Sequence, residues 1–189
     1  ASEEALSPQP AAFAPAGHEV FAHTSAKDGP SGEGVPRMPA LARVVASGLL
    51  IRQGQRAIVP VDALRGAAQV WVRDGLGRTV SAQIEQRVEE LGLAMLALDS
   101  PLSDAPALTA PAADAFPGSQ AHVVAYAGAD HPAPAWPWLH SGFLGPVDVG
   151  TGVRRLGVGL PTGHRGGPVF DASGRLVGMA LAQAGQADR

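Results

Sequence analysis

Residues 163–170 read GHRGGPVF, a pair of glycines followed by a proline and a short apolar segment. Glycine permits backbone conformations and close approaches that a Cβ atom forbids. The segment is therefore predicted to be a tight loop whose main chain lies very near another part of the fold. Arg165 stands in the middle of this loop, and a long cationic side chain needs an explanation there.

The composition indicates one domain rich in turns. The 189 residues are 46% apolar and include 24 glycines and 17 prolines, which favours short strands over long helices. The net charge of −3 comes without a basic stripe, so the sequence shows no footprint for nucleic acid. It has no apolar run of eighteen residues, so no membrane-spanning helix is expected. The lack of cysteine excludes disulfides, thiolate metal sites and a cysteine nucleophile.

Short apolar runs separated by turn residues predict an all-β fold. Residues 1–40 are rich in Pro, Ala and Gly without periodicity, and we expect an extended or flexible arm there. Hairpins are predicted within 41–61 and 67–84, a buried strand within 91–99, and a linker over about 103–118.

A second β series follows the linker. Strands are predicted over 121–128, 139–149 and 153–160, with a proline-rich loop over 129–138. A hairpin is predicted within 168–182, turning at Ser173 and Gly174. The predicted organisation is a folded β region over 41–183 followed by a tail over 184–189. The folded region is divided into a first β unit, about 41–102, and a second, about 119–183.

The segment GLPTGHRGGPVFDASGRLVGMAL resembles the nucleophile region of trypsin-like serine proteases, especially the bacterial HtrA/Deg type. The matching residues are Gly163, Gly166, Gly167, Pro168, Val169, Phe170, Gly174, Leu176, Val177 and Gly178. Residues 46–51, 57–72 and 90–102 are similar to strands of the family's first barrel, and 121–128 and 140–145 to strands of its second. The resemblance covers roughly 41–183 and implies a double β-barrel of the trypsin/chymotrypsin type.

The resemblance also places the catalytic triad on three residues that cannot perform its chemistry. The nucleophilic serine falls on Arg165, the general-base histidine on Asp62 and the triad aspartate on Gly92. Arginine stays protonated, aspartate is a weak base for an alcohol, and glycine has no side chain. We therefore expect no catalytic residue, and we expect Arg165 and Asp62 to face each other, either as an ion pair or as a surface arginine over an inactive cleft.

The function implied is that of a pseudoprotease: a binding, scaffold or accessory subunit of a bacterial envelope complex, with a protein partner. The family is mostly exported, so a periplasmic or secreted location is expected, and the opening ASEEAL is typical of a mature chain after signal cleavage or of a trimmed one. Two alternatives stay open: a hydrolase with a rearranged active site, and a module that holds peptides without cleaving them.

Candidate binding residues fall in two groups. The loop retains a backbone shape suited to a carboxylate or another anion, and a proline-locked tryptophan segment is suited to a partner. The candidates are Gly163, His164, Arg165, Gly166, Gly167, Trp136, Trp138 and His140. No cofactor or metal is predicted, because the six histidines show no ligand motif; His140 and His164 both flank the cleft of the second barrel.

Overall fold

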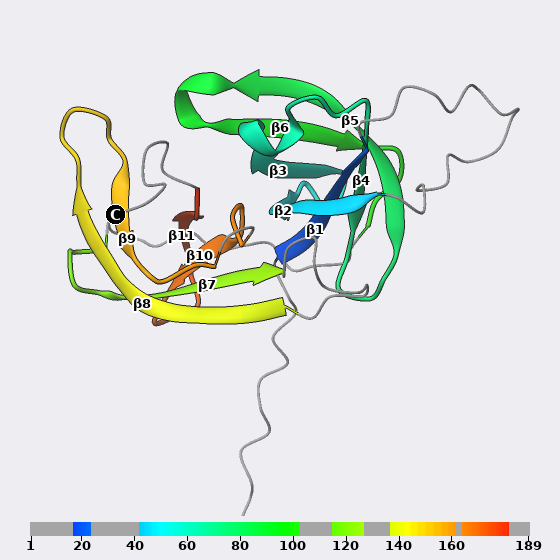
Figure 1. The fold of residues 1–189 in the computed structure, drawn as a ribbon. Coiled ribbons are helices and arrows are strands. Elements are labelled where there is room, and N and C mark those ends of the chain that lie inside the picture. The colour runs from blue at the N-terminus through cyan, green and yellow to red at the C-terminus, as the bar shows by residue number, and fades with distance from the viewer. Residues whose placement is uncertain (1–16, 24–41, 103–114, 127–136, 162–163, 182–189) are drawn as a thin grey trace, which may run out of the picture.

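The computed structural model describes residues 17–23, 42–102, 115–126, 137–161 and 164–181. Its described part consists mostly of β-strands and the turns between them, arranged as two curled sheets side by side (Figure 1). This confirms the predicted all-β double barrel of the trypsin type. No helix among these residues has the length and apolarity needed to cross a membrane.

The first sheet is a closed barrel of six strands in the order β1-β2-β3-β6-β5-β4. The strands are β1 (Gly17–His23), β2 (Arg43–Ile51), β3 (Arg56–Pro60), β4 (Gln69–Arg73), β5 (Thr79–Val88) and β6 (Leu93–Leu98). Alternate side chains fill its core, among them Val59, Val72 and Leu96, none of which is exposed to solvent.

Strand β1 lies inside the range 1–40, which the sequence analysis assigned to an extended or flexible arm. It pairs antiparallel with β2 on one side and with β4 on the other, so that the barrel is closed by a segment that precedes residue 41. The segment GHEVFAH carries little alternation, and its strand conformation depends on the two edges that it joins.

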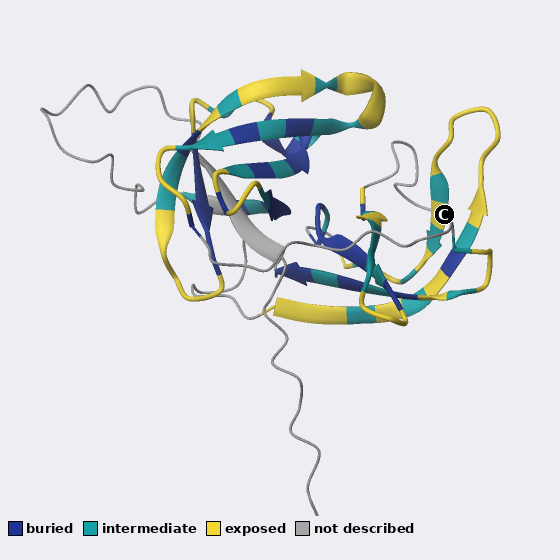
Figure 2. Ribbon diagram, turned by 180° about the vertical axis from the view of Figure 1, so that it is seen from behind, coloured by how far each residue is buried: buried dark blue, intermediate teal, exposed yellow. Residues whose placement is uncertain are grey.

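The second sheet has five described strands in the order β11-β10-β7-β8-β9. They are β7 (Gln120–Tyr126), β8 (Pro137–Val147), β9 (Arg154–Gly157), β10 (Pro168–Asp171) and β11 (Leu176–Met179). Strand β8 begins at Pro137, so Trp138 belongs to a strand and not to the loop predicted over 129–138. Figure 2 shows that exposed residues line much of β8 and the turn into β9.

Each sheet contains a hairpin with the same turn, D-x-x-G-R. In the β4–β5 turn, a carboxylate oxygen of Asp74 accepts hydrogen bonds from the main-chain N–H groups of Leu76 and Arg78, both at 2.9 Å. In the β10–β11 turn, Asp171 accepts those of Ser173 and Arg175 at 2.8 and 3.0 Å. In both turns the arginine side chain pairs with the second carboxylate oxygen, and the glycine adopts positive φ.

The hydrogen bonds in the second turn favour the charged form of Asp171. The main-chain N–H of Arg175 is the largest cause that lowers the pKa of this carboxyl, against an opposing effect of burial. Because the pKa is lower in the folded chain than the ordinary value of about 3.9, the stabilisation is present above about pH 4 and is lost as pH falls through the folded pKa.

We therefore predict that Asp171→Asn lowers the free energy of unfolding at pH 7 and that this difference shrinks on acidification below about pH 4. Urea denaturation of both proteins between pH 7 and pH 3 measures it. A difference that stays constant over this range would contradict the assigned role of the carboxylate.

Candidate functional site

The loop that opens β10 lies where the two sheets meet, and its backbone bonds to both. The main-chain N–H of Ser47, on β2, donates to the carbonyl of Arg165 at 2.8 Å. The N–H of Gly166 donates to the carbonyl of Ala180 at 2.7 Å, on the side of the second sheet. The loop therefore connects the barrels through main-chain bonds at consecutive residues.

Two adjacent glycines are needed because main-chain carbonyl groups lie in close contact with this loop on two sides. A Cβ atom on Gly166 would lie 2.1 Å from the carbonyl oxygen of Ser47, and φ there is +84°. A Cβ atom on Gly167 would lie 2.1 Å from the carbonyl oxygen of Val124, on β7. Gly166 thus permits contact with the first barrel and Gly167 with the second sheet. This agrees with the prediction that the main chain of this loop lies very near another part of the fold.

Arg165 points out of the loop and pairs with Asp62. One guanidinium nitrogen donates to a carboxylate oxygen of Asp62, so that of the two expected arrangements the structure has the ion pair. Asp62 lies on the 3₁₀ turn η1 (Val61–Leu64), whose other three residues are buried and leave its carboxylate facing the seam. The two side chains are 31% and 40% exposed, so water reaches the pair.

Gly92 completes the set of three positions that the resemblance assigns to the triad. It follows the 3₁₀ turn η2 (Glu89–Leu91) in the left-handed conformation, and its carbonyl accepts a hydrogen bond from the main-chain N–H of Val61 at 2.9 Å. A Cβ atom on Gly92 would meet the Cδ1 atom of Leu181 at 3.6 Å. An apolar side chain therefore stands beside the position where an active enzyme of this type would need a carboxylate.

His164 turns the other way, toward the second sheet. It is buried, its Nδ1 atom lies 3.0 Å from the Nε2 atom of His140 on β8, and its ring is tilted against that of Trp138. The structure thus brings together three of the predicted binding residues. Gly163 and Trp136 lie outside the described residues.

Sequence reasoning missed two polar contacts. The hydroxyl of Ser47 is fully buried and accepts the main-chain N–H of Tyr126 at 2.8 Å, a second link between the barrels. The hydroxyl of Ser141 lies 2.9 Å from Nδ1 of His122 on the neighbouring strand. The alternation of side chains along each strand indicates which face Ser141 and His122 occupy. It does not show that they are neighbours, which depends on the register of β7 against β8.

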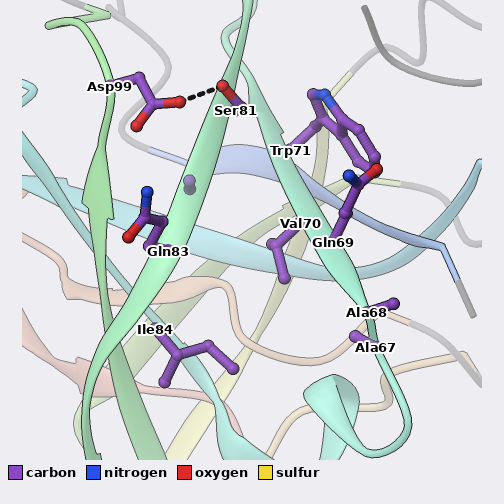
Figure 3. A pocket seen from close by; sticks show the side chains of 10 residues that line it. Ala67, Ala68, Gln69, Val70, Trp71, Ser81, Gln83, Ile84 and Asp99 are labelled. Carbon is purple, nitrogen blue, oxygen red and sulfur yellow. Dashed lines mark hydrogen bonds between the residues drawn. The ribbon is translucent and has the colours of Figure 1, made fainter. Parts of the chain in front are cut away.

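A pocket of about 340 Å³ lies elsewhere, on the first barrel, between β4, β5 and the end of β6 (Figure 3). Its lining includes Trp71, Gln83 and a hydrogen bond between Ser81 and Asp99. None of the predicted site residues lines it. Nor do the described residues contain a cluster of three or more His, Asp or Glu side chains suited to a metal ion.

Comparison with known proteins identifies the family. A model of the trypsin-like peptidase domain matches residues 41–179. The chain belongs to the trypsin-like peptidase domain family. No curated protein matches the sequence at a significant level.

Solved structures agree with the fold of a trypsin-like domain. A serine endoprotease from Yersinia pestis superposes with a TM-score of 0.68 at 16% identity, over 90% of this chain and 55% of the other. The HtrA-type protease AlgW in complex with a tripeptide gives 0.65 at 20%, over 88% and 50%. The MamO protease domain from Magnetospirillum magneticum gives 0.61 at 21%, over 92% and 87%. This trypsin-like chain spans about half the length of the Yersinia pestis endoprotease and of AlgW.

The glycine loop supports a prediction with a matched control. Gly166→Ala is expected to destabilise the fold by more than about 2 kcal/mol, because positive φ and contact with the Ser47 carbonyl both oppose a Cβ atom. Gly174→Ala has similar φ, +74°, with no atom within 4 Å, and should cost only about 1–2 kcal/mol. Thermal and urea unfolding measure both; equal losses would refute the close contact.

The ion pair predicts a coupling energy between Asp62 and Arg165. Because both side chains are partly exposed, a double-mutant cycle with Asp62→Ala and Arg165→Ala should give about 0.2–1 kcal/mol at low salt. The coupling should decrease as salt is added, since ions screen the pair. Strictly additive effects of the two substitutions at low salt would show that the side chains do not interact in solution.

Proposed function

We propose that this trypsin-like chain is a pseudoprotease that acts by binding, as a scaffold or accessory subunit of a protein complex in the bacterial envelope. The observation that carries the proposal is the Arg165–Asp62 ion pair, which lies at the positions that the family resemblance assigns to the nucleophile and the general base. Attack on a peptide bond needs a nucleophile that can lose a proton and a base that can take it. A guanidinium is no such nucleophile, and a carboxylate paired with it is a weak base for an alcohol.

The third position supports the same proposal. At Gly92 no side chain is available to orient a base, and Leu181 lies against the space where one would project. Restoring catalysis would require three simultaneous changes, one of them beside an apolar neighbour. The envelope location rests on the resemblance to a mostly exported family and on no feature of the fold.

The surface of β8 supports a role in binding. Trp138, Leu139 and Phe143 are 51%, 62% and 56% exposed, which brings large apolar side chains to solvent along one strand. Aromatic residues are enriched at protein interfaces and often carry most of the binding energy. Trp138 and Leu139 are neighbours on the strand and so face opposite sides of the sheet, and Phe143 shares the face of Leu139. We assign the partner-binding surface to the exposed start of β8, where Trp138 and Leu139 both reach solvent, with Trp138 as its principal contact.

One observation favours a rearranged hydrolase as the second candidate. Ser141 and His122 form a hydrogen-bonded serine–histidine pair, the first requirement of an activated nucleophile. Among the described residues, no carboxylate hydrogen-bonds to His122 to orient it. Both residues also lie within extended strands and not on a loop that would aim two main-chain N–H groups at an oxyanion.

A serine-directed fluorophosphonate probe distinguishes the two candidates. We expect no labelling of this chain under conditions that label trypsin fully. Labelling that disappears in Ser141→Ala but persists in Ser81→Ala would overturn the proposal and support the rearranged hydrolase.

The binding role is tested by isolating the tagged chain from the envelope fraction of its own host. We expect a stoichiometric partner that is lost when Trp138→Ala is combined with Leu139→Ser. The control variant Leu76→Ser changes an 83% exposed residue on the β4–β5 turn and should retain the partner. Recovery of the chain alone, or equal recovery of a partner by both variants, would remove the support for β8 as the binding surface.

A further inference from the structure

The pocket on the first barrel lies between two strands that diverge. Strands β4 and β5 are paired as far as Val70 and Ala82, and beyond these two residues the described part of the chain pairs β5 with β6 only. The pocket, of about 340 Å³, lies where the β4–β5 pairing ends, between 67–70 on one side and 81–84 on the other. Figure 3 shows the side chains of Val70 and Ile84 in the space between the two strands.

The main-chain N–H and C=O groups of Ile84 face the β4 side, where this pocket lies. In an antiparallel pair, every second residue exchanges hydrogen bonds with its partner strand, and the residues between them turn their groups to the other side. The N–H of Asp74 donates to the carbonyl of Arg78 at 3.0 Å, so the even-numbered residues at the start of β5 turn toward β4. The N–H of Asp99 donates to the carbonyl of Ser81 at 3.0 Å, on the β6 side, which agrees with this assignment.

Ala68 would be the next partner of Ile84 if the pairing of β4 with β5 continued. The turn after η1 directs the chain away from that pairing, since the N–H of Ala67 donates to the carbonyl of Leu64 at 3.2 Å and Gly66 has a φ of +71°. No main-chain hydrogen bond joins Ala68 to Ile84, and the described residues offer Ile84 no other main-chain partner on this side. Free main-chain groups at a strand edge are a template on which another extended segment can add.

We propose that this pocket binds a short extended segment of a partner protein, which adds to the edge of β5 by main-chain hydrogen bonds to Ile84. The segment is short because the register of β5 against β6 shifts between Ile84 and Gln86, and such a bulge interrupts the regular edge. The proposal does not rest on the pseudoprotease assignment, because no residue at a triad position lines the pocket. It adds a second contact surface to the one at the start of β8.

The lining favours a neutral or basic segment. Asp99 is the only charged residue among the described residues that line the pocket, and one of its carboxylate oxygens accepts the hydroxyl of Ser81. An acidic side chain would meet this carboxylate without a cation in the described lining to offset the repulsion. Gln69 and Gln83 are exposed, and their side-chain amides carry the same kinds of donor and acceptor as a peptide bond.

The test is amide hydrogen exchange of the full chain, followed by NMR, with and without the peptide Lys-Val-Thr-Val-Thr capped at both ends. Valine and threonine favour the extended conformation that the pocket requires. The amide of Ile84 should exchange rapidly in the free chain and at least about tenfold more slowly when the peptide is bound. The amide of Val80, which faces its partner on β4, should be slow in both states and is the internal control. This measurement needs no substitution.

A pair of variants locates the peptide. Ala68→Trp should fill the pocket from its exposed side and abolish the slowing, whereas Ala172→Trp, at an exposed position in the β10–β11 turn, should retain it. Replacing the lysine of the peptide by glutamate should weaken binding, and Asp99→Asn should reduce that difference.

Three results would overturn the proposal: an Ile84 amide that is as slow as that of Val80 in the free chain, one that the peptide leaves unchanged, or equal slowing in wild type and Ala68→Trp. None of them bears on the pseudoprotease assignment, which probe labelling and partner recovery test separately.

Discussion

The main-chain contact between the glycine loop and Ser47 is the constraint on which the rest of the structure depends. It joins β2 of the first barrel to the start of β10 in the second, and it needs a residue without a Cβ atom at Gly166. The buried hydroxyl of Ser47 adds a bond to the main chain of Tyr126 at the same place. The main-chain N–H and the hydroxyl of one small serine thus hold both halves together, because within the described part of the chain each bonds to a main-chain group of the other half.

This constraint separates the backbone of the loop from the chemistry of its side chains. The glycines and Pro168 are needed for packing whether or not the loop carries a nucleophile, so a protease-like motif around Arg165 does not imply proteolysis. Arg165 then occupies the direction that the backbone leaves open, toward η1. A partly exposed ion pair adds little stability, so the pair bears more on the proposed loss of proteolysis than on the fold.

The sequence predicted the features that depend on local pattern. Turn residues marked the hairpins, and the order of glycines placed Arg165 opposite Asp62 through the family resemblance. It did not predict β1, because GHEVFAH carries little alternation and its strand conformation depends on pairing with β2 and β4. The prolines before Trp138 favoured a loop, yet Pro137 starts a strand, the position in a sheet where a missing N–H is tolerated.

Pairings across strands decide the remaining polar contacts, and these are the least visible in a single sequence. His122 meets Ser141, and His140 meets His164, through the register of β7 against β8 and the position of the loop, not through spacing along the chain. His164 and Arg165 are consecutive, yet one bonds toward the second sheet and the other toward the first. Because the backbone between them is fixed by its contacts to Ser47 and Ala180, each side chain can take on a separate role without disturbing the junction that the glycines maintain.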